Sequence, residues 1–152
     1  SRLLRLEGNS VVSWDISDSQ KLHFRSNVGI NIAKSLSDVP SSLRYFAGGD
    51  GNLRGYGYES ISPRDENGEL TGARYMLTAG IEYQHQVYRS IWLGAFLDAG
   101  DAFDQQADWK RGTGVSLIWN SQLMPVKLDF AYGLDAPEGD EFRIHFSLGT
   151  QF

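Results

Sequence analysis

A single arginine lies within an unusually glycine-rich stretch of the sequence. Five glycines occur within residues 48–57, and Arg54 stands among them with aromatic residues on both sides. Glycine lets a backbone adopt positive φ and approach other chain segments closely, and a guanidinium can bind a carboxylate at two points. A buried guanidinium needs carboxylates to offset its desolvation, and Glu82 and Asp98 are the candidates. The residues therefore permit an anchor, whereas composition alone favours the alternative, a flexible surface loop with a solvated Arg54.

Other residue types that could support chemistry are scattered. The histidines His23, His85 and His145 fall in different segments and lack a neighbouring nucleophile motif. Asp98, Asp101 and Asp104 are three residues apart, a spacing that divides them between the two faces of a strand. The calcium-repeat-like run 48–52 occurs once, cysteine is absent, and no phosphate-binding loop is present. We therefore expect no enzyme activity, no metal site and no cofactor.

Composition favours strands and limits the classes of partner. The 152 residues carry a net charge of -5 without a basic cluster, so we expect no nucleic-acid partner. Seventeen Gly and nineteen aromatic residues (7 Tyr, 8 Phe, 4 Trp) are typical of turns and β-strands. No apolar run reaches the ~18–20 residues of a membrane helix. The mean hydropathy of -0.35 still permits a membrane barrel, because its strands alternate apolar and polar residues.

Hydrophobic residues recur with a period of two along the chain. In the last segment, 141–152, one parity is apolar (Phe142, Ile144, Phe146, Leu148 and Phe152) and the other is polar. Six earlier segments show the same alternation: 2–14, 21–33, 73–86, 91–103, 112–119 and 124–134. Each has about the 9–11 residues that a tilted strand needs to cross a bilayer. The connections are short except for 34–72. A connection of that length is uncommon in a compact domain unless it is functional, so we expect a function for it.

The alternation also sorts the charged residues. Glu82 and Asp98 share the polar parity with Arg25, Lys127 and Asp129. In a transmembrane barrel this parity faces the lumen, where an inserted loop could bring Arg54 to both acids. We therefore predict an all-β fold, an antiparallel transmembrane β-barrel with meander topology, in contact with the lipid bilayer. A soluble β-rich binding domain is the alternative of another class, since its strands also alternate.

Seven strands do not close a bacterial single-chain barrel, which has an even number of strands. The sequence therefore predicts that residues 1–152 are the C-terminal portion of an outer-membrane β-barrel domain whose preceding part supplies further strands. An open sheet leaves backbone groups unpaired at both edges. An isolated fragment is expected to self-associate through these edges.

The loop and two strands resemble motifs of a known family. Phe46-Ala47-Gly48-Gly49 and Leu53-Arg54-Gly55-Tyr56 resemble the sixth extracellular loop of the bacterial surface antigen superfamily, which includes BamA, TamA and the two-partner secretion transporters. In that family the arginine of the loop meets an acid on the thirteenth strand, within the pattern F-x-D-x-G. The pattern is present here as Phe96, Asp98 and Gly100, and a second family acid on the twelfth strand corresponds to Glu82. The resemblance implies strands ten to sixteen of a sixteen-strand barrel in the bacterial outer membrane.

Within the superfamily, the runs 44–50 and 54–61 are most similar to the TamA branch, the outer-membrane subunit of the translocation and assembly module. This implies insertion of nascent outer-membrane proteins such as autotransporters, together with an inner-membrane partner subunit. The last segment resembles a C-terminal signal strand through Phe146, Leu148 and Phe152, although Ser147 and Thr150 depart from that pattern. The alternative within the same architecture is the barrel of a two-partner secretion transporter.

Overall fold

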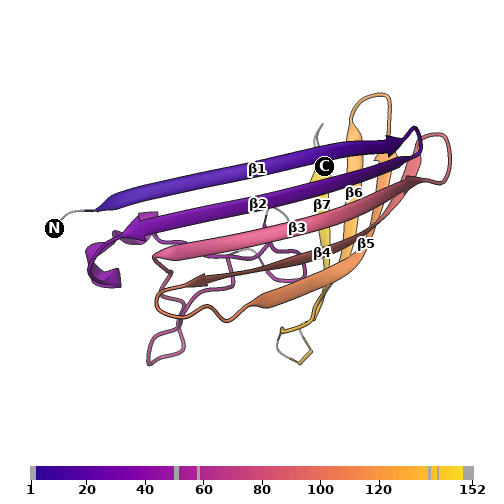
Figure 1. Cartoon of the computed structure of the whole chain (residues 1–152). Coiled ribbons are helices and arrows are strands. Elements are labelled where there is room, and N and C mark those ends of the chain that lie inside the picture. The colour runs from indigo at the N-terminus through magenta and orange to yellow at the C-terminus, as the bar shows by residue number, and fades with distance from the viewer. Residues whose placement is uncertain (1–2, 50–51, 58, 137, 140, 149–152) are drawn as a thin grey trace.

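The computed structural model describes residues 3–49, 52–57, 59–136, 138–139 and 141–148. Its strands form one antiparallel sheet in which each strand pairs with its neighbours in the sequence (Figure 1). The seven strands are β1 Leu4–Ser17, β2 Gln20–Ile32, β3 Tyr75–Gln86, β4 Ile91–Phe103, β5 Lys110–Asn120, β6 Pro125–Gly133 and β7 Phe142–Leu148. This confirms the predicted all-β meander. The first strand extends three residues beyond its predicted end at residue 14, with a register shift between Asp15 and Ser17.

The connections differ between the two ends of the sheet. Residues 18–19, 87–90 and 121–124 form short turns at one end, and the longer segments 33–74, 104–109 and 134–141 lie at the other. In bacterial barrels, short turns face the periplasm and long loops face outward. Two single-turn 3-10 helices, η1 Leu36–Asp38 and η2 Ser41–Leu43, begin the longest connection.

Among the described residues, no helix is long and apolar enough to span a membrane.

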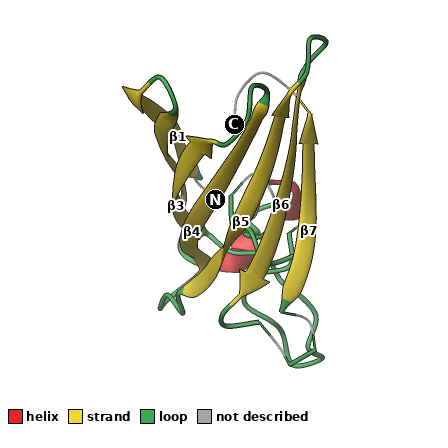
Figure 2. Cartoon of the chain, turned by 90° about the vertical axis from the view of Figure 1, so that its right-hand side faces the viewer, coloured by secondary structure: helices red, strands yellow, loops and turns green. Residues whose placement is uncertain are grey.

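The sheet curves (Figure 2). Its two faces have opposite character. On the convex face, large apolar side chains are exposed: Ile81 is 44% exposed, Leu97 49% and Val115 56%. On the concave face, polar side chains are buried, with Glu82 at 3% and Asp98 at 0%. A soluble sandwich would bury the apolar face instead. The distribution is that of a barrel wall with an apolar outer surface and a polar interior.

The segment 33–74 folds into the hollow of the curved sheet (Figure 2). Its own backbone pairs through isolated bridges, including Tyr45 with Ala73 and Ala47 with Ile61. A small apolar core holds it against the wall, consisting of Ala47, Leu53, Tyr56, Ile61, Ala73 and Ala102. Arg44 donates hydrogen bonds to three backbone carbonyls at the start and end of the segment. The described parts of the long connection therefore pack on the interior face of the wall.

Candidate functional site

Arg54 is buried against the concave face and binds two strands at once. Its Nε and a terminal nitrogen donate to the two Asp98 oxygens at 2.7 and 2.8 Å, the two-point geometry of a guanidinium on a carboxylate. The other terminal nitrogen donates to Glu82 Oε1 at 2.5 Å. The backbone N–H of Arg54 also donates to Asp98, at 3.0 Å. With 3% of its surface exposed, Arg54 is not the solvated side chain of a flexible loop.

The strand register explains why these groups meet. Glu82 on β3 lies opposite Phe96 on β4, and Gly80 lies opposite Asp98, so both acids project from adjacent positions of one face. Phe96 and Asp98 are two residues apart and share that face. The Phe96 ring lies under the guanidinium, whose carbon is 3.7 Å from the ring centroid. Such a cation–π contact strengthens when water is excluded.

A second cation and a third acid complete the cluster. Lys127 Nζ donates to Glu82 Oε1 at 2.8 Å and lies 3.6 Å from Asp129 Oδ1. Asp129 Oδ1 is also 3.5 Å from Arg54 Nη1. The Ser116 hydroxyl contacts both Glu82 and Asp129, and Gln84 donates to Glu82. Three buried carboxylates are thus held by two cations and two neutral donors, and apart from Arg54 these groups come from four consecutive strands, β3 to β6.

Sequence reasoning placed Lys127 and Asp129 on the polar face but did not assign them to the Arg54 cluster. Ser116 and Gln84 were not assigned either. Strand parity put these residues on one face, but only the register between strands shows that they are neighbours. Gln84 pairs with Gly94, Gly94 pairs with Ser116, and Ser116 pairs with Asp129.

Glycines in the wall let the loop's backbone approach closely. A Cβ on Gly112 would lie 1.8 Å from the Arg54 carbonyl oxygen, and one on Gly133 would lie 2.6 Å from the Gly55 oxygen. Gly55 itself has φ +98, a conformation that favours glycine. The backbone of the loop tip therefore packs directly against the wall at positions where any residue larger than glycine would collide with it.

The neighbours of Arg54 in the motif have separate contacts. Leu53 is fully buried in the loop's apolar core. The Gly55 N–H donates to His145 Nε2 on β7 at 3.1 Å. The Tyr56 hydroxyl donates to the Arg111 carbonyl at 2.7 Å and accepts from the Asp135 N–H at 3.0 Å. The tip is thus tied to the wall from β3 as far as β7.

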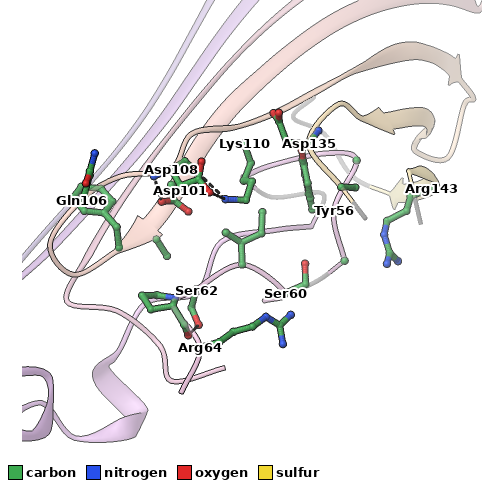
Figure 3. Close-up of a pocket in the computed structure, with 17 residues that line it drawn as sticks. Tyr56, Ser60, Ser62, Arg64, Asp101, Gln106, Asp108, Lys110, Asp135 and Arg143 are labelled. Atoms are coloured by element: carbon green, nitrogen blue, oxygen red, sulfur yellow. Dashed lines mark hydrogen bonds and ion pairs between the residues drawn. The ribbon is translucent and has the colours of Figure 1, made fainter. Parts of the chain in front are cut away.

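A cavity of about 460 Å³ lies beside Tyr56, between the loop and the long-loop end of the wall (Figure 3). Its lining mixes acidic and basic groups: Asp101, Asp108, Asp135, Arg64, Lys110 and Arg143. The hydrogen bonds that Arg111 donates hold the pKa of Asp135 below its usual range. Within the described part of the chain, no His, Asp and Glu side chains gather into a group that could hold a metal ion.

The remaining predicted site residues lie apart from this cluster. Gly100 is packed closely, since a Cβ there would lie 2.6 Å from the Leu77 carbonyl oxygen. Phe146 and Leu148 are each 55% exposed on the convex face of β7. Phe152 and Thr150 are outside the described residues. The structure brings Arg54, Glu82, Asp98 and Phe96 together, and their functional role stays a prediction.

Comparison with known proteins decides the family. The Omp85 superfamily domain matches residues 2–152. The chain belongs to the Omp85 superfamily. The match confirms the resemblance at the level of the superfamily, and the chain is part of an outer-membrane β-barrel.

Two relatives are outer membrane protein assembly factors named BamA. The protein from Nitratidesulfovibrio vulgaris is 30% identical over 151 residues, which cover 90% of this chain and 19% of that protein. The protein from Neisseria meningitidis is 25% identical over 154 residues, which cover 76% of this chain and 19% of that protein. The chain thus spans about a fifth of the length of these relatives.

A solved structure shares the fold. The crystal structure of BamA from Haemophilus ducreyi lacking POTRA domains 1–3 superposes with a TM-score of 0.76 at 19% identity. The match covers 95% of this chain and 34% of the solved one.

Proposed function

We propose that this chain forms the C-terminal seven strands, ten to sixteen, of the sixteen-strand barrel of an outer-membrane protein assembly factor. The cluster around Arg54 carries the proposal, because its three buried carboxylates bind the arginine that fixes a loop inside the wall. Each of these acids is engaged in that contact, so none of the three is positioned for bond-breaking chemistry. The similarity to two BamA proteins supports an assembly role.

The mechanism follows from which strands the loop holds. Arg54 and its partners tie β3 to β6 together through side chains as well as through backbone pairing. Beyond them, β7 has one neighbour, β6, among the described strands. A strand with a free edge can template an incoming strand by backbone hydrogen bonding. In this mechanism β7 is one side of a seam that opens, while the fixed loop keeps the neighbouring wall from opening with it.

The finer assignment is to a TamA-type subunit. Its support is the resemblance of the loop runs 44–50 and 54–61 to the TamA branch. The clients would then be nascent outer-membrane proteins such as autotransporters, and an inner-membrane subunit would be the partner. The second candidate is a two-partner secretion barrel, which conducts one exported chain. The seated loop does not separate the two candidates, because its motif resembles that of the whole superfamily, so the choice between them rests on the test of clients.

A reconstitution experiment tests the assignment. The full-length protein in proteoliposomes should raise the folded yield of an added autotransporter barrel, scored by resistance to heat denaturation in gels. Arg54→Gln should lower that yield. In cells, rescue of a strain lacking TamA supports the finer assignment, whereas rescue of a BamA-depleted strain alone supports the BamA branch. Secretion of one partner protein without any effect on barrel folding would overturn the assembly role.

A further inference from the structure

A third cation, Arg25 on β2, lies beside the Arg54 cluster. It shares a small hollow of about 30 Å³ with Arg54, Glu82 and Lys127. It interacts electrostatically with the three buried carboxylates, and among them most strongly with Asp98. Within the described part of the chain it makes no hydrogen bond. Arg25 is therefore close to the acids without being bound to any of them.

The charges of the cluster balance only when Arg25 is counted. The three buried carboxylates face the two cations that bind them, Arg54 and Lys127, which leaves one negative charge over. Arg25 supplies the missing positive charge from across the hollow. A buried carboxylate that loses its partner is costly, because the remaining charge is left desolvated. The position of Arg25 therefore matters most if one of the two bound cations is withdrawn.

The strand register brings Arg25 within reach of one acid in particular. Arg25 on β2 lies opposite Gly80 on β3, and Gly80 lies opposite Asp98 on β4. The Asp98 carboxylate extends over Gly80, because a Cβ at that position would collide with Asp98 Oδ1. Neighbouring strands are about 4.8 Å apart, a distance that an arginine side chain spans. No side chain from the intervening position on β3 separates Arg25 from Asp98.

Arg54 keeps Arg25 away from Asp98 in two ways while the loop is in place. Its guanidinium occupies both carboxylate oxygens of Asp98 with hydrogen bonds. Its positive charge also repels Arg25, and this repulsion is stronger than the attraction of any one of the three acids. Withdrawal of Arg54 removes the occupant and the repulsion together.

We propose that Arg25 is a second partner of Asp98, which binds this carboxylate whenever Arg54 is withdrawn. Its planar guanidinium can donate to both oxygens, as that of Arg54 does. The exchange avoids leaving Asp98 buried and unpaired, so the loop can leave the wall and return at a lower cost. Arg25 cannot replace the other contacts of the loop, so the state with Arg54 bound stays the more stable one. The exchange of partners does not depend on the assembly role.

Unfolding of the full-length protein in lipid bilayers measures the exchange. Arg54→Gln alone leaves Arg25 available for Asp98, whereas in an Arg25→Gln background the carboxylate has no second partner. We expect Arg54→Gln to raise the equilibrium constant for unfolding at least about tenfold more in that background than in the parent protein, a coupling of about 1.4 kcal/mol. Arg25→Lys keeps the charge but lacks the fork, so it should recover part of the difference.

Two controls separate the exchange from simple repulsion between the two arginines. In an Asp98→Asn background there is no carboxylate to exchange, so the extra loss should vanish, whereas repulsion between Arg25 and Arg54 would persist. Lys21→Gln removes a charge from the same face of β2, where Lys21 contacts the Trp92 ring. Its effect should combine with that of Arg54→Gln within about twofold of independence.

A structure of the full-length Arg54→Gln variant tests the same point without a second substitution. The Arg25 guanidinium should lie within hydrogen-bonding distance of an Asp98 oxygen. An Arg25 side chain that keeps its present position in this variant would overturn the proposal. Independent effects of Arg25→Gln and Arg54→Gln, or a coupling that survives in Asp98→Asn, would overturn it as well.

Discussion

Replacing Arg54 by glutamine tests the anchor that the structure describes. The guanidinium donates three hydrogen bonds to Asp98 and Glu82, and both carboxylates are buried. Removing one partner of a buried ion pair costs about 3–5 kcal/mol, because the remaining charge is left desolvated. Lys127 still compensates Glu82 but is not paired with Asp98. We therefore expect Arg54→Gln to lower the free energy of unfolding by about 3–5 kcal/mol.

The assay is urea unfolding of the full-length protein in lipid bilayers, followed by tryptophan fluorescence. Arg64→Gln is the matched control, because Arg64 lies in the same loop and its side chain donates to the Gly68 carbonyl at an exposed position. Its loss should stay within about 0.5 kcal/mol.

A double-mutant cycle separates the ion pair from packing. Asp98→Asn alone should also destabilise the protein, and adding it to Arg54→Gln should cost little more, because the pair is already broken. We expect a coupling energy of at least about 1.5 kcal/mol, in the range for residues in one network. Additive losses, or a loss below about 1 kcal/mol for Arg54→Gln, would refute the reasoning that this contact anchors the loop.

Two further predictions concern the seat of the loop tip. Gly112→Ala should lower the free energy of unfolding by about 3 kcal/mol, the upper end for overpacking, because its Cβ would lie 1.8 Å from the Arg54 carbonyl oxygen. Gly8→Ala is the control: a Cβ at Gly8 would have nothing within 4 Å, so its free energy of unfolding should not change in the same assay. His145→Leu should speed hydrogen exchange of the Gly55 amide, since its acceptor is lost, whereas His145→Gln retains an acceptor. Unchanged exchange in His145→Leu would mean that this hydrogen bond does not hold the tip.

The wall could be predicted from the sequence because its signal is local. Alternation alone located seven strands and put Glu82 and Asp98 on one face, and the structure shows both features. The partnership of Lys127 with Glu82 could not be predicted, because it depends on register across three strand pairs, β3 with β4, β4 with β5 and β5 with β6. The entry of the loop and the contacts of Arg54 with Glu82 and Asp98 were predicted. The internal pairing of 33–74 could not be predicted, since its bridges join residues up to 28 apart, as in Tyr45 with Ala73.

The buried acids couple the loop to the pairing of the strands. Glu82, Asp98 and Asp129 come from three different strands, and the loop that carries Arg54 precedes all three in the chain. Without the loop, the wall would gather three carboxylates with only Lys127 and Arg25 to offset them, and the remaining repulsion would oppose close strand pairing. Entry of the loop and close pairing of β3 to β6 are therefore energetically coupled, because Arg54 supplies the positive charge that lets the three carboxylates lie together.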